Sequence, residues 1–225
     1  MIATLAPRFT KLPPAQRRLW PRLRPSVPLE FVLYGGTAIS LHLGHRRSVD
    51  FDFFHDRPLD LTALRSAFGF LDTARTLQQT KDTLVVVAAG VKVSFFGGLR
   101  FGRVGDPLLT RDGMAEVASL DDLMAHTLKV ILQRAEKKDY EDITAMLRAG
   151  VSLAQGLAAA RLLFGPAFQP TESLTVARVI PAKSSRSAPS LSAGSGSTST
   201  MITAGDCCPW NRRMLEKVSC PGVVS

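Results

Sequence analysis

Cysteine is scarce in this chain and is found only near its end. The 225 residues include three cysteines, Cys207, Cys208 and Cys220. A core without cysteine has no structural disulfides, which is typical of cytoplasmic proteins. The adjacent pair with one distant cysteine also lacks the ligand spacing of a zinc site. We therefore expect a cytoplasmic protein whose core contains no disulfide.

Long hydrophobic runs are missing as well. No apolar segment approaches the roughly 20 residues that a membrane-spanning helix needs. The first residues, MIATLAPRFTKLPP, contain no continuous hydrophobic segment before a cleavage site, so we expect no signal peptide. The sequence has no internal repeats. We therefore expect one protein domain that acts outside the membrane.

Acidic residues are fewer than basic ones, 19 against 28, which gives a formal net charge of +9. A moderately basic surface favours polyanions such as nucleic acid, although an ordinary solvated surface has the same composition. The same two readings apply to a basic helix predicted over residues 13–24, where Pro13 and Pro14 suit the first turn. Its arginines either contact nucleic acid or form a solvated face.

The strongest pattern is FVLYGGTAISLHLGHRRSVDFDFF, residues 31–54. Its first four residues are apolar and predict a buried strand. Gly35-Gly36 then makes a turn without a Cβ, Thr37 is placed to cap a short helix, and Gly44 is placed to end it. Exposed N–H groups at such a turn, where a helix begins, form an anion site. We therefore predict that Gly35, Gly36 and Thr37 hold phosphates.

Strict alternation in the pentad VDFDF predicts a second strand with two different faces. Its core face is formed by Val49, Phe51 and Phe53, and its other face by Asp50 and Asp52. Two carboxylates at i and i+2 bind hard cations through oxygen, and Mg²⁺ is the usual ion when phosphates complete its shell. Asp50 and Asp52 are therefore the predicted metal ligands. The alternative is a strand whose solvent face simply carries two acids.

A carboxylate pair beside a phosphate site predicts a nucleoside triphosphate (NTP) bound through its phosphates and metal. Arg46 and Arg47 lie between the two motifs, and a guanidinium holds phosphate through two parallel hydrogen bonds. Both arginines are therefore candidate nucleotide-binding residues. A different reading joins His45 and His55 to the carboxylates as a metal-dependent phosphohydrolase.

The rest of the chain predicts more strands and then helices. Residues 83–96 contain two apolar strands around Ala89-Gly90, a two-residue hairpin turn. Helices are expected over residues 59–68, from Ser119 onward, from about residues 133–143 to Gly150, and over residues 153–163. The fold class is therefore α/β (α+β), with a small mixed sheet followed by a helical C-terminal half.

The composition changes beyond Leu174. Residues 184–200 contain eight serines and two threonines among seventeen residues. Such a segment buries too little apolar surface to offset its chain entropy. We therefore expect a folded domain over residues 1–172 and a low-complexity, disordered tail over residues 173–225. A shifted reading frame would produce the same change.

The order of strand, Gly-Gly turn, helix and D-x-D strand resembles the nucleotidyltransferase superfamily. YGGTAISLHLGHRRSVDFDFF, and later DDLMAHTLKVILQRAEKKDYEDI, resemble more specifically the AbiEii/AbiGii toxin family of bacterial nucleotidyltransferases. The resemblance runs from about residue 10 to residue 172. It implies a nucleotidyltransferase-like fold and Mg²⁺-dependent transfer of a nucleotide from an NTP. It also implies a toxin of a toxin–antitoxin or phage-defence system, with tRNA or another RNA as acceptor and a cognate antitoxin as partner.

Two positions depart from the pattern that the resemblance implies. In the superfamily a third carboxylate often lies on a neighbouring strand, where it binds metal or helps to deprotonate the attacking hydroxyl, and here that place falls to Ser94. The family's phosphate-binding lysine would fall at Thr127, so Lys129, two residues further on, is the candidate instead.

The second family-like motif supplies one more catalytic candidate. The resemblance makes Asp139 the base, or an orienting group near the metal. The alternative is an acid at the N-terminus of a helix, where the helix dipole stabilises it. Because Ser94 and Thr127 replace an acid and a lysine, a second function stays open, a non-catalytic nucleotide- or RNA-binding protein on the same fold.

Overall fold

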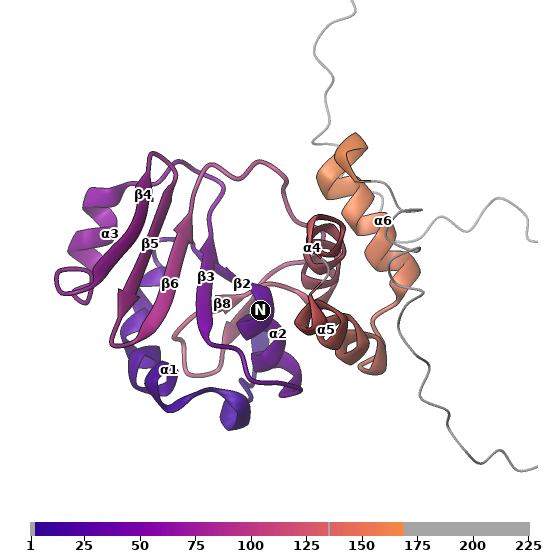
Figure 1. Ribbon diagram of the computed structural model, residues 1–225, viewed down its shortest axis with the longest axis horizontal. Coiled ribbons are helices and arrows are strands. Elements are labelled where there is room, and N and C mark those ends of the chain that lie inside the picture. Colours follow the sequence, from indigo (N-terminus) through magenta and orange to yellow (C-terminus); the bar gives the residue numbers. More distant parts are fainter. Residues whose placement is uncertain (1–2, 135, 169–225) are drawn as a thin grey trace, which may run out of the picture. The chain divides into compact units, whose positions relative to one another are not determined.

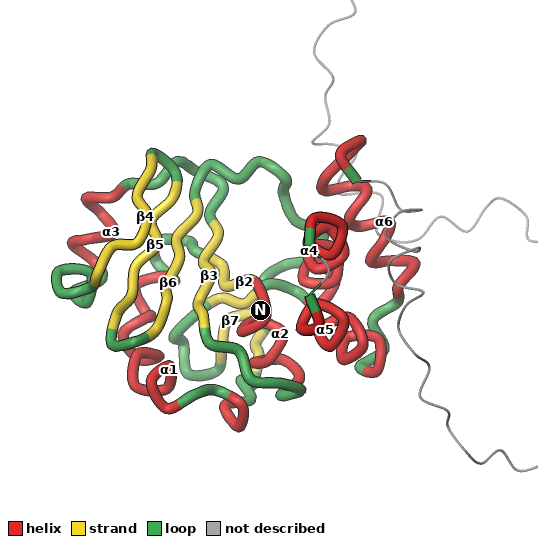
Figure 2. Tube along the Cα trace, viewed as in Figure 1, coloured by secondary structure: helices red, strands yellow, loops and turns green. Residues whose placement is uncertain are grey.

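The computed structural model describes residues 3–134 and 136–168, so the predicted tail over residues 173–225 lies outside the described residues. All described residues belong to the first of two compact units of the chain, residues 1–182. Within this unit, Figures 1 and 2 show a sheet and, beside it, a group of three C-terminal helices.

The described residues form one eight-stranded sheet in the order β1-β7-β8-β2-β3-β6-β5-β4. The strands are β1 (Thr4–Leu5), β2 (Val32–Tyr34), β3 (Asp50–Phe54), β4 (Arg75–Thr80), β5 (Thr83–Ala88), β6 (Val91–Phe96), β7 (Leu108–Thr110) and β8 (Glu116–Val117). The pairs β1–β7, β2–β8 and β3–β6 are parallel, and the other pairs are antiparallel. The predicted mixed sheet is thus confirmed.

Six α-helices accompany the sheet in the described part of the chain. They are α1 (Pro14–Leu19), α2 (Gly35–Leu43), α3 (Leu61–Ala67), α4 (Leu120–Gln133), α5 (Lys137–Arg148) and α6 (Leu153–Phe164). Short 3-10 helices follow β1, α1 and α6 at η1 (Phe9–Lys11), η2 (Trp20–Ser26) and η3 (Gly165–Ala167). Since α4, α5 and α6 come last, the predicted α/β class with a helical C-terminal half is confirmed. None of the helices in the described ranges has both the length and the hydropathy of a membrane span.

The core lies on one face of the central strands. Phe51 and Phe53 of β3 and Phe95 of β6 are completely buried. The ring of Trp20, in η2, lies 6.0 Å from that of Phe51, and the ring of Phe68, just after α3, lies 5.1 Å from that of Phe95. The N-terminal helical segment and α3 therefore cover the core face, and the opposite face of β3 and β6 carries Asp50, Asp52, Lys92 and Ser94 together with Phe54 and Phe96.

Two details of the predicted first motif were wrong. Val49 precedes β3 and is 53% exposed, because ladder pairing with β6 begins only at Asp50. Thr37 does not cap α2, because the helix already begins at Gly35 with Tyr34 as its N-cap residue. The two glycines are therefore the first turn of the helix, and their N–H groups belong to its N-terminus.

The hairpin and the C-terminal helices follow the sequence signals. Ala89 and Gly90 both have positive φ, 50° and 78°, as a two-residue type I′ turn requires. Ser119 caps α4 by accepting a hydrogen bond from the N–H of Asp122 at 3.1 Å. Instead of completing a capping box, the Asp122 carboxylate accepts from the N–H groups of Val104 and Gly105 at 2.8 and 3.0 Å. Asp122 thus fastens the loop after β6 to the start of α4.

Candidate active site

The two predicted carboxylates lie side by side on one face of β3. Asp50 and Asp52 are half-buried, whereas Phe51 between them is completely buried. In the parallel pair of β3 and β6, Asp50 lies opposite Lys92 and Asp52 lies opposite Ser94. Because paired residues share a face, these four side chains point to the same side of the sheet. The predicted separation of the acidic face from the core face is confirmed.

Basic side chains lie near the two carboxylates of Asp50 and Asp52 and partly offset their negative charge. Lys92 Nζ lies 3.0 Å from Asp50 Oδ2. Burial raises the pKa of Asp52 above its ordinary value, while a hydrogen bond from Ser94 and the charges of Lys92 and Arg134 act to lower it. Burial therefore disfavours the ionised form of Asp52, and the nearby positive charges partly offset this effect. A bound cation would stabilise the ionised form further.

Ser94 occupies the place where the superfamily carries a third acid. It is buried, and its hydroxyl hydrogen bonds to Asp52. In the described ranges no three histidine, cysteine or acidic side chains converge as a metal site. The remaining donors still fit Mg²⁺, because this ion is bound in proteins by one or two carboxylates, with waters and substrate phosphates as its other ligands. Asp50 and Asp52 provide that set.

The start of α2 lies directly against the carboxylates. Gly35 has a φ of 74°, and a Cβ added to it would lie 3.2 Å from Asp52 Oδ2. A Cβ on Gly36 would lie 2.3 Å from Arg46 Nη2. Both glycines therefore permit close approach of a site side chain to the helix N-terminus. Thr37 is buried and its hydroxyl donates to the carbonyl oxygen of Asp50 at 2.5 Å, which joins α2 to β3.

Arg46, predicted to hold phosphate, is paired with Asp142 of α5. Its Nε donates to Asp142 Oδ1 and its Nη2 to Asp142 Oδ2, each at 2.6 Å. His45 Nε2 also lies 2.7 Å from Asp142 Oδ1. This arrangement joins the loop between α2 and β3 to the second family-like motif. Asp142 belongs to the second family-like motif but was not predicted as a site residue.

The other predicted phosphate-binding residues lie in different environments. Arg47 is exposed, and its carbonyl oxygen accepts a hydrogen bond from Arg46 Nη1 at 3.0 Å. Lys129 is half-buried on α4. Thr127, where the family's lysine would fall, is buried, and its hydroxyl donates to the carbonyl oxygen of Leu123 at 2.8 Å. The roles of Arg47 and Lys129 stay predictions.

Asp139, the predicted base, lies in the first turn of α5. Its Oδ2 accepts a hydrogen bond from the N–H of Glu136 at 3.2 Å, so the side chain also caps its own helix. Burial raises the pKa of Asp139, and the charges of Arg134 and Lys138 act to lower it. The charge of Arg134, which pairs with Glu136 at 3.1 Å, acts to lower the pKa values of both Asp139 and Asp52. Arg134 belongs to the second family-like motif but was not predicted as a site residue.

The histidines of the phosphohydrolase reading do not join the carboxylates. His45 is bound to Asp142. The ring of His55 lies 5.0 Å from the buried ring of Phe31, tilted by 39°, and its Nδ1 accepts a hydrogen bond from the N–H of Arg57. Since no histidine-containing metal cluster is found in the described ranges, this reading receives no support from the structure.

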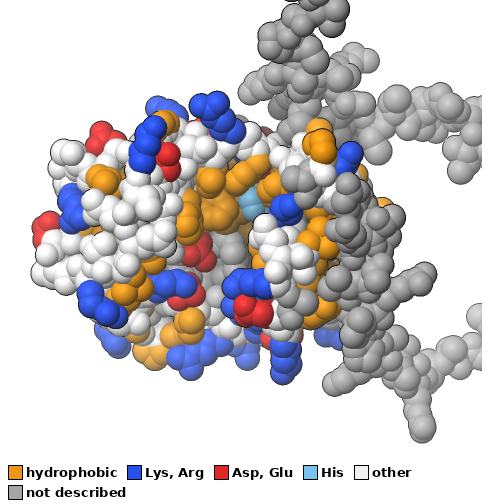
Figure 3. Space-filling view, turned by 45° about the horizontal axis from the view of Figure 1, so that its top comes forward, with side chains coloured by type: hydrophobic (Ala, Val, Ile, Leu, Met, Phe, Trp, Pro, Cys, Tyr) orange, Lys and Arg blue, Asp and Glu red, His pale blue; other side chains and the backbone are white. Residues whose placement is uncertain are grey.

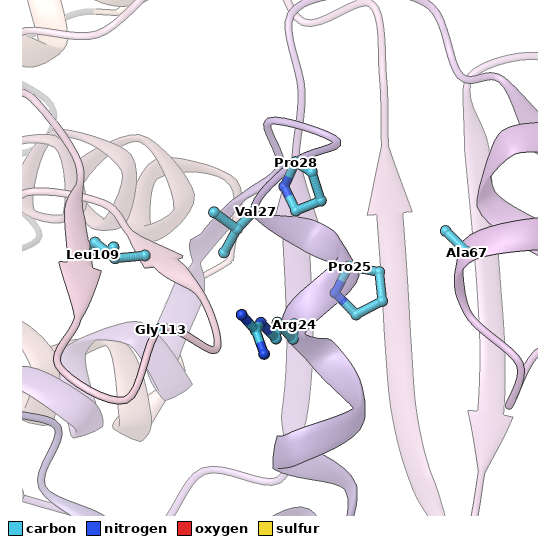
Figure 4. Close-up of a pocket in the computed structure, with 7 residues that line it drawn as sticks. All are labelled: Arg24, Pro25, Val27, Pro28, Ala67, Leu109 and Gly113. Atoms are coloured by element: carbon cyan, nitrogen blue, oxygen red, sulfur yellow. The ribbon is translucent and has the colours of Figure 1, made fainter.

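One face of the molecular surface contains a hollow with acidic side chains (Figure 3). Figure 3 shows acidic side chains within a hollow, with hydrophobic side chains and a histidine along its wall and basic side chains on both sides. A separate apolar depression, shown in Figure 4, contains none of the candidate site residues; it is lined by Arg24, Pro25, Val27, Pro28, Ala67, Leu109 and Gly113. The chemistry of the molecule is therefore expected at the hollow with the carboxylates.

Comparison with known proteins gives two matches. A family model described as "Nucleotidyl transferase AbiEii toxin, Type IV TA system" matches residues 18–181. The chain is also 36% identical over 121 residues to the protein aq_aa25 of Aquifex aeolicus (strain VF5), whose printed name says that it is uncharacterized. That alignment covers 53% of this chain and 58% of the relative, so the chain spans little more than half of the relative's length. The family match ends beyond residue 172, the boundary predicted for the domain.

Proposed function

The chain belongs to the AbiEii family of nucleotidyl transferase toxins, and from this we propose that it transfers a nucleotide from an NTP to an acceptor with release of pyrophosphate. The matched range, residues 18–181, includes every candidate site residue. The observation that carries the proposal is the position of Asp50 and Asp52 on one face of β3, directly against the glycines that begin α2. Two candidate metal ligands thus lie at a helix N-terminus, the kind of place that favours anions.

Different residues near Asp50, Asp52 and the start of α2 would bind different parts of the triphosphate. Asp50 and Asp52 would hold Mg²⁺, which neutralises negative charge on the phosphates. The N–H groups of Gly35, Gly36 and Thr37 point out of the helix N-terminus and favour anionic oxygens. Lys92 and Arg134 add positive charge near Asp52. This division matches a substrate with several phosphate groups.

The transfer itself needs a proton acceptor. The acceptor hydroxyl oxygen forms a bond to the α-phosphorus, the bond from that phosphorus to the bridging oxygen breaks, and pyrophosphate leaves with the electron pair. The hydroxyl proton goes to the carboxylate of Asp139. The raised pKa of Asp139 makes it a stronger base than an exposed aspartate, which suits this role.

Arg46 has a positioning role in this account. Its guanidinium is held by Asp142 and lies against the backbone of Gly36. The ion pair therefore sets the distance between the first turn of α2 and helix α5, which carries Asp139. We expect its loss to disturb the alignment of the base with the phosphates.

The proposal also names the acceptor of the nucleotide and the protein partner. A net charge of +9 favours a polyanionic acceptor, and we propose RNA, such as tRNA. The family description places its members in type IV toxin–antitoxin systems, so we propose a toxin of the cytoplasm that has a cognate antitoxin and acts in phage defence.

The test is incubation with each α-labelled NTP, Mg²⁺ and total RNA. We expect label to enter RNA with the wild-type protein and to be lost with Asp50→Asn or Asp52→Asn. Asp139→Asn should also lose transfer but keep NTP binding, because it removes a proton acceptor and no phosphate contact. Asp72→Asn, at an exposed aspartate away from the motifs, is the matched control. Full activity in both Asp50→Asn and Asp52→Asn would contradict the assignment.

A second candidate function is nucleotide or RNA binding without catalysis. It is favoured by Ser94 in place of a third acid and by Thr127 in place of a lysine. On this reading the wild type binds NTP without label transfer, and Asp139→Asn changes nothing. Ser94 lies opposite Asp52, so the substitution Ser94→Asp would then add a metal ligand and produce nucleotide transfer.

A further inference from the structure

Aromatic side chains line the same face of the sheet as the carboxylates. We name this set the aromatic wall, and its members are Tyr34, Phe54, Phe96, Phe101, His126 and Phe164. Tyr34 stacks on Phe54 with ring centres 4.7 Å apart, and Phe96 meets Phe54 edge-on at 5.4 Å. His126 lies 4.7 Å from Phe101 and 5.1 Å from Phe164. The wall therefore joins β2, β3 and β6 to α4 and α6.

The position of the aromatic wall is fixed by the strands that carry Asp52. Tyr34 lies opposite Asp52 in the antiparallel pair of β2 and β3. Phe54 follows Asp52 by two residues on the same face of β3, a separation of about 7 Å. The hydrophobic side chains in the hollow of Figure 3 border the acidic ones in the same way. A molecule bound at the carboxylates would therefore reach the wall.

The rings of the aromatic wall pack against the core but are less buried than the core rings. Phe51, Phe53 and Phe95 of the core are completely buried, whereas all members of the wall except Tyr34 keep part of their surface exposed. Several half-buried rings together form an apolar surface that a flat ligand can cover.

His126 adds a polar atom to this surface. Its Nε2 is buried and has no hydrogen-bond partner in the part of the chain that the structure describes. Burial lowers the pKa of His126 to about 4, so the imidazole is neutral near pH 7. A buried polar atom without a partner costs free energy, and a ligand that supplies the partner recovers it. The wall therefore offers ring faces and, at His126 Nε2, a polar atom that has no partner within the described residues.

We propose that the aromatic wall binds the base of the NTP, with the base stacked on the half-buried rings and its polar edge directed to His126 Nε2. This inference rests on the proposed function, because the phosphates must be held at Asp50 and Asp52. A nucleobase combines a flat π-face with polar edge atoms, which is the combination that the wall offers.

The test compares a ligand that has a base with one that has none. Binding of Mg²⁺-ATP and of Mg²⁺-tripolyphosphate is measured by calorimetry for wild type and variants. Phe101→Leu removes a ring but keeps apolar bulk, and it should weaken ATP about tenfold while leaving tripolyphosphate unchanged. Phe9→Leu is the matched control, because Phe9 is also half-buried but lies against Trp20 on the core side of the sheet. It should change neither affinity.

A second variant guards against a folding defect in the first. His126→Phe keeps a ring in place and removes Nε2, so ATP binding should weaken several-fold with tripolyphosphate binding unchanged. Unchanged ATP affinity in both folded variants would overturn the inference, as would equal affinity of the wild type for ATP and tripolyphosphate. A higher KM for the RNA acceptor with unchanged ATP affinity would assign the wall to the acceptor and overturn it as well. Failure of the wild type to bind either probe would instead overturn the proposed function on which the inference rests.

Discussion

Asp142 accepts hydrogen bonds from Nε and Nη2 of Arg46 at 2.6 Å each, and its Oδ1 also lies 2.7 Å from His45 Nε2. Its side chain is only 4% exposed. A buried carboxylate is tolerated when cations and donors surround it in this way, and removal of one partner leaves a buried charge behind. The ion pair therefore contributes to the stability of the first motif as well as to its geometry.

Removal of this carboxylate should destabilise the protein. We expect Asp142→Ala to lower the free energy of unfolding by about 3 kcal/mol, because Arg46 is then left without its partner. Glu141→Ala is the control, since Glu141 pairs with the 91% exposed side chain of Lys137 and should cost less than about 1 kcal/mol. Urea denaturation measures both values. Equal losses of unfolding free energy in the two variants would show that the Arg46–Asp142 pair stabilises the protein no more than an exposed ion pair does.

The carboxyl group of Asp52 predicts a pH dependence. Burial is the largest influence and raises its pKa above the ordinary value of 3.8. The folded state thus binds this proton more tightly than the unfolded state, so the stability of the metal-free protein falls as pH rises from about 3.8 through the pKa of the folded protein. Asp52→Asn has no such proton. In EDTA it should be more stable than wild type at pH 7, with a difference that shrinks towards pH 4. A difference independent of pH would refute this reading.

At the scale of elements, strand β3 carries a core face and a functional face. We expect Phe51→Ala to lower the free energy of unfolding by about 3–5 kcal/mol, because it leaves a cavity beside Trp20 and Phe53. Val49→Ala, at an exposed position just before the strand, should change it by less than about 0.5 kcal/mol. Thermal and urea unfolding give both values. A Phe51→Ala protein as stable as wild type would mean that the faces of β3 are assigned the wrong way round.

Helices and strands could be predicted where burial of one face produces a regular spacing of apolar residues in the sequence. The alternation in β3, the apolar strands of the β5–β6 hairpin and the Ser119 cap of α4 each have a local signature that the structure confirms. By contrast, all six residues of β4, RTLQQT, are exposed, so this edge strand pairs through its backbone and shows no alternation. Strands β1 and β8 have two residues each and contain too little sequence to show a period.

At the scale of the whole molecule, the candidate site depends on contacts between distant segments. Asp50 and Asp52 were predictable because they lie on one strand. The pairing of Arg46 with Asp142 spans 96 residues, and nothing in the local sequence indicates it. The aromatic wall also escapes sequence reasoning, because Tyr34, Phe101 and His126 come from different elements and meet only in the folded chain. Tertiary structure therefore supplies the partners of residues that the motifs identify.

The most direct measurement compares the fate of a label at the α-phosphate of the NTP with that of a label at the γ-phosphate. Purified protein is incubated with Mg²⁺, total RNA and an NTP labelled either at the α- or at the γ-phosphate, and with Asp52→Asn protein in parallel. The account predicts that α-label enters RNA, that γ-label is released as pyrophosphate, and that Asp52→Asn does neither while remaining folded. Entry of γ-label into RNA, or equal α-label transfer by wild type and Asp52→Asn, would contradict it.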